Sequence, residues 1–483
     1  MDYIYSIGLI YVFALFTGIF YINKNPDLSF WLIISLYFDP GNYISNVLGN
    51  YLGRIDYQDI LILFVVILII KIKGKHRYIQ NNILLKQFYF FFIIFFLYHV
   101  FVYGIIIPFI KDDLNINMFF LKNRRYFYGI IIMYGGYLYS LRGLKYLYLT
   151  ILFTALVTLS FFWLSIISGV HFIEYISFGR YYKSSIMRIT LNSYGIFDLV
   201  FPLSLIVLFL SKRREITIPY KRLLYFVGIL MLLTLLITLS RRVILDIAGT
   251  FLIFIYLISK ISKVSMFNIS YKTIRLAFFS IIFLFLIKPN YINYVKKVSE
   301  DIYLLITTGK DTEGQGEDRM SGGGIYQDLF PEIEKNIIFG TGYSYTEWIL
   351  INNYPKAVST RGLKFGQLVD AATEIPILAL FFFYGIIGST FVIILYINII
   401  FLAKKTYLKL KKSFFYSIKK DQILVIFSVY FIYWIIRMFT YNAYSLGLHF
   451  SGIYFQSNGL WFGIMFGIHQ SLTKYKMLSA GNE

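Results

Sequence analysis

The sequence predicts an all-α, polytopic integral membrane protein. Hydrophobic residues make up 58% of the 483 residues, charged residues make up 15%, and the mean hydropathy is +0.66. A soluble domain has roughly 25% charged residues, so this composition is typical of a membrane protein. Apolar runs of roughly 17 to 25 residues recur along nearly the whole chain, and each can cross a bilayer as a helix. Because the runs do not alternate with polar residues, helices rather than barrel strands are expected.

We expect about thirteen spans, within a range of about 12 to 14, from the ~20 apolar residues that one crossing requires. These expected spans cover residues 5–22, 28–44, 57–72, 87–110, 125–142, 146–168, 193–211, 222–239, 242–259, 273–288, 374–403, 421–440 and 454–472. The second run is interrupted by Asp39-Pro40-Gly41, so the count changes by one if this run does not cross. The chain is expected to be one membrane domain in three parts: an N-terminal bundle (1–288), a long external loop (289–373) and C-terminal helices (374–483).

The net charge of +21 is distributed in a way that predicts topology. Three short loops are strongly basic, whereas the long loop carries slightly more acids than bases. Short basic loops are retained in the cytoplasm, which puts the C-terminus inside and the N-terminus and the long loop outside. The expected partners of the basic loops are anionic lipid headgroups, and no nucleic acid is expected. The basic residues of these loops are Lys71, Lys73, Lys75 and Arg77, then Lys212, Arg213, Arg214, Lys221 and Arg222, then those of Lys404 to Lys420.

The sequence contains no cysteine, which excludes disulfides, thiolate catalysis and a Cys-ligated metal. A cleaved signal peptide is not expected, because Met1-Asp2 is not basic and no small-residue cleavage pattern follows.

The long loop has a predicted internal organisation. Apolar residues at helical spacing from Val295 predict an amphipathic helix that lies on the membrane or on the bundle. The Gly-rich stretch that follows, 311–324, predicts a flexible connector and carries Arg319. A second amphipathic segment begins at Ile325 and is expected to stop at Gly340 and Gly342. The loop is thus expected to be a mobile external lid.

Several arginines are placed outside by this topology, against the trend that keeps basic residues within. Arg180 and Arg188 lie in the loop that follows residue 168, and Arg241 and Arg242 lie at the outer start of a span. Such side chains can snorkel to headgroups or stabilise helix C-termini. Alternatively, the planar guanidinium group can bind a phosphate with two parallel hydrogen bonds.

The order of three phrases resembles the O-antigen polymerase and O-antigen ligase superfamily. Ser240-Arg241-Arg242 begins a span, a long external loop closes in IIFGTGYS (337–344), and a polar residue precedes a span that contains YGIIG (384–388). The resemblance covers residues 239–389 and extends to the rest of the chain only through hydropathy. The IIFGTG phrase lacks the family's proline. Glu374, eleven residues before Gly385, stands where ligases carry a histidine and many polymerases an acid, which favours a polymerase.

The resemblance implies a metal-independent membrane glycosyltransferase with a GT-C-like helical fold and no cofactor. It would polymerise undecaprenyl-pyrophosphate-linked oligosaccharide repeats, which serve as both donor and acceptor, into O-antigen or a related surface polysaccharide. The enzyme would be a multi-pass protein of the bacterial plasma membrane with its active site facing the periplasm or outside. A flippase and a chain-length regulator are its expected protein partners.

The reaction implied by the resemblance needs a base for the acceptor hydroxyl and positive charge at the leaving pyrophosphate. Glu374 is the expected base, with Asp370 in reserve. The candidate pyrophosphate ligands are Arg241, Arg242, Arg319, Arg188 and Arg180.

Other interpretations remain open. Glu374 could instead be a first-turn acid that favours the helix dipole ahead of Pro376. Asp198 and Asp246 fall inside expected spans, where an ionisable group is costly, and we expect them to pair with a base or line a cavity. The alternatives to a polymerase are an O-antigen ligase and a lipid-linked oligosaccharide flippase. No internal repeat of the kind found in transporters is evident. A dolichol-phosphate-sugar glycosyltransferase would need paired acids in its first external loop, which Asp112-Asp113 do not provide.

Overall fold

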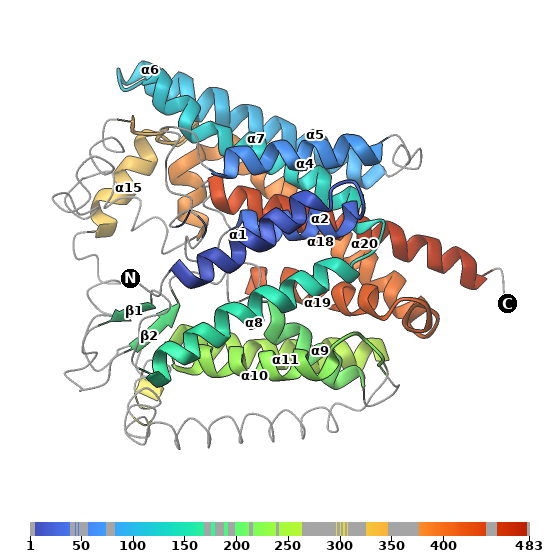
Figure 1. Ribbon diagram of the computed structural model, residues 1–483. Coiled ribbons are helices and arrows are strands. Elements are labelled where there is room, and N and C mark those ends of the chain that lie inside the picture. Colours follow the sequence, from blue (N-terminus) through green and yellow to red (C-terminus); the bar gives the residue numbers. More distant parts are fainter. Residues whose placement is uncertain are drawn as a thin grey trace.

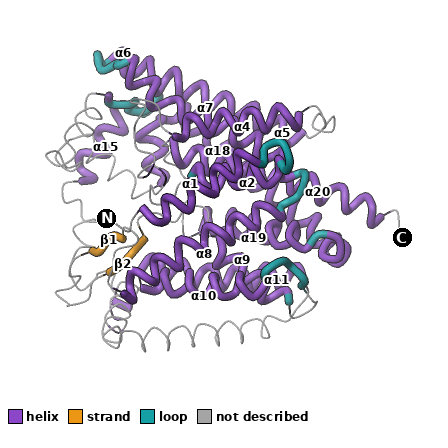
Figure 2. Tube along the Cα trace, viewed as in Figure 1, coloured by secondary structure: helices purple, strands orange, loops and turns teal. Residues whose placement is uncertain are grey.

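The computed structural model is predominantly helical (Figure 1). It describes residues 5–38, 44, 47, 57–73, 83–168, 175–178, 188–191, 199–211, 216–237, 241–262, 296, 300, 303–304, 307, 325–345, 376–440 and 452–480. Figure 2 shows helices throughout the described chain, together with one hairpin of two short strands.

The described elements follow the predicted order of apolar runs. In the first half they are α1 (Tyr5–Phe20), α2 (Pro26–Tyr37), α4 (Tyr57–Lys73), α5 (Ile83–Leu97), the π-helix η2 (Tyr98–Ile106), α6 (Ile107–Ile110), α7 (Ile116–Ser140) and α8 (Lys145–Ser168). In the second half they are β1 (Tyr175–Phe178), β2 (Arg188–Leu191), α9 (Val200–Leu210), α10 (Lys221–Ile237), α11 (Arg241–Ser262), α15 (Ile325–Lys335), α18 (Pro376–Lys420), α19 (Gln422–Thr440) and α20 (Gly452–Ala480).

The two ends of the helical bundle are different. The hairpin, α15, α6 and the beginning of α1 lie at one end, which we call the hairpin end, and α20 finishes at the opposite end (Figure 1). Strands β1 and β2 are antiparallel, with Tyr175 opposite Leu191 and Phe178 opposite Arg188. The hairpin end is therefore where the elements of the predicted external loops gather.

Three helices in the described chain are long and apolar enough to cross a membrane, namely Leu85–Ile110, Lys145–Ser168 and Leu380–Lys420. Shorter apolar helices cover Ile7–Phe20, Val200–Leu210, Ile247–Ser262 and Gln422–Arg437. Expected spans and observed helices agree to within three residues at both ends for α1, α4, α8, α10, α11 and α19. The expected span at 273–288 lies outside the described residues. The helix expected from Val295 to residue 309 also lies outside them, except for isolated helical positions such as Tyr303 and Leu304.

Some boundaries predicted from the sequence were wrong. Helix α18 continues through the lysine-rich stretch 404–420, which was expected to be a loop. Its buried residues there recur at helical spacing, at Thr406, Leu410, Phe414 and Ser417, so one face packs on the bundle. The lysines of this stretch are exposed except Lys409, which is half-buried and bonds to α20. Helix α7 begins at Ile116 rather than at residue 125. Helix α15 ends at Lys335, before the glycines that were expected to stop it.

Helices α7 and α20 approach each other through glycines spaced four residues apart. A Cβ atom at Gly459 would lie 2.8 Å from the carbonyl oxygen of Gly129. One at Gly463 would collide with the carbonyl of Met133, and one at Gly467 with Ser140. Small residues at this spacing let helix backbones come close, which is a common way for helices to associate in membranes.

Candidate functional site

Helix α18 is broken at Gly385. This residue has φ 60° and ψ −168°, a conformation that is essentially restricted to glycine. The break removes the hydrogen bonds that the N–H groups of Ile386 and Ile387 would make to carbonyls four residues earlier. The helix interior therefore offers unpaired donors and acceptors that another segment has to satisfy.

The segment that follows α15 satisfies these groups. We call residues 336–345 the strap. Ile386 N–H donates to the Ile337 carbonyl at 2.7 Å, and Ile387 N–H donates to the Ile338 carbonyl at 3.2 Å. In return, both the N–H and the hydroxyl of Thr341 donate to the Phe382 carbonyl, at 2.9 and 3.0 Å. The strap thus bridges the two halves of α18, and we call this arrangement the joint.

Each of the four glycines in the two phrases lies at the joint. Gly340 has φ +83°, and a Cβ atom there would collide with the Phe383 carbonyl. A Cβ atom at Gly342 would collide with Ile107, and one at Gly388 with the ring of Tyr98. Gly340 and Gly385 are therefore needed for the close approach of the strap and α18, Gly342 for that of the strap and α6, and Gly388 for that of α18 and η2.

The irregular helix η2 supplies the third side of the joint. Ile107 N–H bonds to the Val102 carbonyl, five residues earlier, which leaves the Tyr103 carbonyl free to accept from Tyr343 N–H at 3.3 Å. Pro108 has no N–H to offer the Gly104 carbonyl, which accepts from the Tyr345 hydroxyl at 2.8 Å instead. The π-helical turn and the proline together create the acceptors that hold the strap.

Two further groups on this side complete the joint. The Tyr98 hydroxyl lies 2.9 Å from the Phe339 carbonyl and 2.8 Å from that of Tyr384, so its one proton is shared between the strap and the broken helix. Asp113 accepts from Tyr345 N–H at 2.8 Å. Asp112-Asp113 do not match the paired acids of a dolichol-phosphate-sugar glycosyltransferase, and Asp113 instead holds the end of the strap.

His99 lies behind the joint in a cluster of aromatic rings. Its ring centroid is 3.9 Å from that of Tyr126, 5.1 Å from that of Tyr103 and 5.7 Å from that of Tyr384. Its Nδ1 atom is buried without a hydrogen-bond partner among the described residues. The cluster packs directly behind the residue that precedes the break, Tyr384, and fixes its position.

The electrostatics of the joint centre on Lys111, which donates to the Thr341 carbonyl at 2.7 Å. Partial desolvation of the ammonium group lowers the pKa of Lys111 below its usual range, and the carboxylates of Glu332 and Asp113 partly offset this effect. Burial raises the pKa of Tyr343 well above its usual range, so this phenol stays neutral. The charge of Lys335 lowers the pKa of Lys111 further, so the joint holds two cations beside two acids and neutral hydroxyl groups.

A half-buried ion pair that the sequence did not predict joins α4 and α7. Arg124 bonds to Asp59 at 2.7 Å, and the Tyr128 hydroxyl donates to the other oxygen of the same carboxylate at 2.7 Å. Arg124 and Arg125 are adjacent basic residues at the predicted outer side of a span. They therefore depart from the rule that basic residues stay on the cytoplasmic side, as Arg241 does. Applying that rule to every span end would have found them.

The predicted site residues fall into two groups. Arg188 is the first residue of β2, and Arg241 and Arg242 are the first residues of α11. Helix α10 runs towards the hairpin and α11 follows it after three residues, so α11 begins at the hairpin end (Figure 1). Arg180, Arg319, Asp370, Glu374 and Asp198 lie outside the described residues. Asp246 belongs to the second turn of α11.

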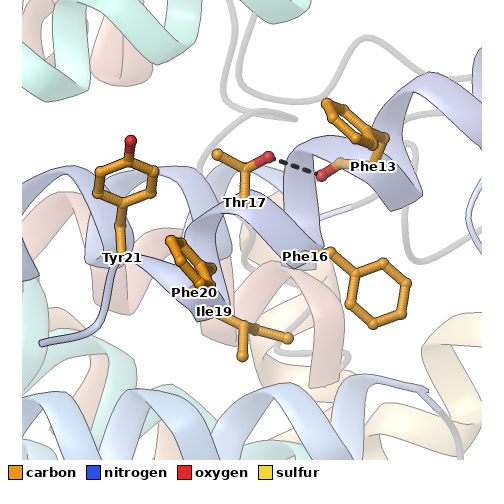
Figure 3. Close-up of a pocket in the computed structure, with 6 residues that line it drawn as sticks. All are labelled: Phe13, Phe16, Thr17, Ile19, Phe20 and Tyr21. Atoms are coloured by element: carbon orange, nitrogen blue, oxygen red, sulfur yellow. Dashed lines mark hydrogen bonds between the residues drawn. The ribbon is translucent and has the colours of Figure 1, made fainter.

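A shallow apolar hollow of about 480 Å³ lies on α1 and contains none of the predicted site residues. Figure 3 shows its lining residues, Phe13, Phe16, Thr17, Ile19, Phe20 and Tyr21. Phe13 is 76% exposed and Phe20 is 67% exposed. Exposed aromatic side chains along one helix are typical of a surface that contacts lipid.

Comparisons of the chain with protein-family models, with curated proteins and with solved structures found no match.

Proposed function

We propose that this chain is a multi-pass protein of the bacterial plasma membrane that polymerises undecaprenyl-pyrophosphate-linked oligosaccharide repeats. The active site would face the periplasm or outside, and the fold would be a GT-C-like helical bundle. The product would be O-antigen or a related surface polysaccharide. The proposal rests on the resemblance to the O-antigen polymerase and ligase superfamily.

One structural observation supports this proposal most strongly. The two glycine phrases that carry the resemblance, 337–344 and 384–388, are far apart in the sequence and are hydrogen-bonded to each other at the joint. Chance similarity in two unrelated segments would not require them to meet. The strap ends at Tyr345 and α18 begins at Pro376. The proposed base Glu374 and its reserve Asp370 lie in the sequence between these two residues.

In the proposed reaction, an acceptor sugar hydroxyl attacks the anomeric carbon of the lipid-linked glycan. The new glycosidic C–O bond forms while the bond from the anomeric carbon to the pyrophosphate oxygen breaks. Glu374 takes the hydroxyl proton, and the pyrophosphate leaves with the electron pair of the broken bond.

Arginines would stabilise the leaving pyrophosphate in place of a divalent ion. Arg241 and Arg242 begin α11 and Arg188 begins β2, so the backbone brings three of the five proposed ligands to the hairpin end. Arg319 and Arg180 would complete the set. Guanidinium groups fixed before the reaction stabilise developing negative charge without reorganisation.

The test is reconstitution of the purified protein with undecaprenyl-pyrophosphate repeat units in the presence of a chelator. The expected result is longer chains, with release of undecaprenyl pyrophosphate. The expected loss of rate for Glu374→Gln is roughly 100-fold to 10,000-fold, with Glu334→Gln on the exposed face of α15 as a matched control.

Three outcomes separate the alternatives. Transfer only to a lipid A-core acceptor would indicate a ligase, and movement of repeats across the bilayer without new bonds would indicate a flippase. Arrest by the chelator would contradict the metal-independent scheme. Full rate in both Glu374→Gln and Asp370→Asn would contradict the assigned base.

A further inference from the structure

The strap exposes apolar side chains at a point where its backbone is fully engaged. Ile337, Ile338 and Phe339 are 43%, 53% and 50% exposed. Their three carbonyls accept hydrogen bonds from Ile386 N–H, Ile387 N–H and the Tyr98 hydroxyl. A surface loop in water usually has the opposite arrangement, with polar side chains and solvated carbonyls.

Hydrogen bonds to two helices place strap residues 337–339 well inside the helix ends that are predicted to face outward. On α18 the strap meets residues 386 and 387, about ten residues after the helix begins at Pro376, which corresponds to roughly 15 Å along the helix axis. On the neighbouring helix, Phe339 meets the hydroxyl of Tyr98, which lies twelve residues before Ile110, the end of the apolar span. The strap enters after Lys335 and rises again to the level of Asp113, which binds Tyr345.

The exposed strap residues continue an apolar stripe on α18. Ile386 is 48% exposed, and Ile393, Ile397 and Ile400 follow it at helical spacing with similar exposure. The backbones of Ile337 and Ile338 bond directly to the first two residues of the stripe region, Ile386 and Ile387. The strap therefore joins the beginning of this stripe, in which the one exposed polar side chain between Ile386 and Ile393, Thr390, bonds back to the Ile386 carbonyl at 2.7 Å.

We propose that the strap is a re-entrant segment whose Ile337, Ile338 and Phe339 side chains contact the acyl chains of the outer leaflet. This rests on the membrane location in the proposed function and not on its chemistry. Irregular backbone is tolerated at membrane depth only where its polar groups are bonded within the protein, and the three carbonyls meet this condition. The end of the long loop, from residue 336 to residue 345, is then an anchor in the membrane and not part of the expected external lid.

Single-cysteine variants test this directly, because the natural chain contains no cysteine to remove. Ile338→Cys, Ile393→Cys and Glu334→Cys are each spin-labelled in vesicles of phosphatidylethanolamine and phosphatidylglycerol. The measurement is the collision rate with oxygen, which concentrates in acyl chains, and with a water-soluble nickel chelate. Ile393 on the α18 stripe is the lipid reference, and the exposed Glu334 on α15 is the aqueous reference.

The expected ratio of oxygen to nickel collision rates at Ile338 equals that at Ile393 and is several-fold higher than that at Glu334. A ratio at Ile338 like that at Glu334, with Ile393 still in lipid, would overturn the re-entrant strap alone. Water-like ratios at both Ile338 and Ile393 would overturn the membrane location as well. Low rates with both reagents at Ile338 would mean that a second copy of the chain covers the strap, which also overturns the proposal. Ile337→Cys gives a second probe if Ile338→Cys does not fold.

Discussion

Gly385 and Gly340 are backbone neighbours although they lie on different segments: a Cβ atom on Gly385 would lie 2.5 Å from the Gly340 nitrogen. Both residues have positive φ, +60° and +83°. Neither segment could keep its backbone path with a larger residue at these positions. The break in α18 and the path of the strap are thus one structural feature shared by two distant parts of the sequence.

Gly385→Ala is expected to destabilise the protein by about 3 kcal/mol or more, because backbone strain and overpacking add. Gly143→Ala is the matched control, since Gly143 also has positive φ, +129°, and nothing lies within 4 Å of an added Cβ. Thermal unfolding in detergent measures both variants. Equal melting temperatures for the two variants would show that the close approach of the strap and α18 does not matter.

Tyr98→Phe is expected to cost about 1 to 3 kcal/mol, because the Phe339 and Tyr384 carbonyls lose the donor that they share. Tyr220→Phe is the control, because Tyr220 is 67% exposed. The measurement is the melting temperature, together with protease susceptibility near residue 339. If Tyr98→Phe unfolds like Tyr220→Phe, the hydroxyl is not a structural part of the joint.

The joint should become more stable as the pH rises towards 10.5, the usual pKa of lysine. Desolvation lowers the pKa of Lys111 in the folded protein, so between this lowered value and 10.5 the unfolded chain binds more protons than the folded one. The free-energy cost of desolvating the charged ammonium group is fully present below the pKa of the folded protein, and it disappears as the pH rises to 10.5. The Lys111→Gln variant has no titrating group at this position. The melting temperature of the wild type should therefore rise relative to that of the variant across this pH window. A pH-independent difference between the two proteins would contradict the desolvation of Lys111.

Arg241→Gln and Arg242→Gln are expected to lower kcat/KM for the pyrophosphate donor by roughly tenfold to 100-fold each, because each removes a charge-assisted hydrogen bond. Melting temperatures should stay unchanged. Arg222→Gln, at the start of α10 and at the other end of that helix from the hairpin, is the matched control and should keep full activity. Wild-type donor kinetics in both Arg241→Gln and Arg242→Gln would remove these residues from the proposed pyrophosphate site.

The local sequence predicted most helices but not the features that shape the site. Apolar length located α8 and α10 because a helix that buries an apolar face needs no distant partner to specify its extent. It could not predict that α18 breaks at Gly385, because an isolated glycine is tolerated in a regular helix. The break is stable only because the strap supplies the missing hydrogen bonds. The π-helical turn of η2 escaped prediction for the same reason.

By itself, the sequence determined the helical, strongly apolar character of this protein and the positions of its basic stretches, because both follow from residue type over short windows. It also marked the two glycine phrases, without indicating that they touch. Only the tertiary structure decided that Gly340 serves the break at Gly385, that Tyr98 and Asp113 hold the strap, and that Ile338 faces outward. The physical reason is that unpaired backbone groups inside a helix are satisfied by whichever segment the whole fold brings to them, and short windows of sequence do not contain that segment.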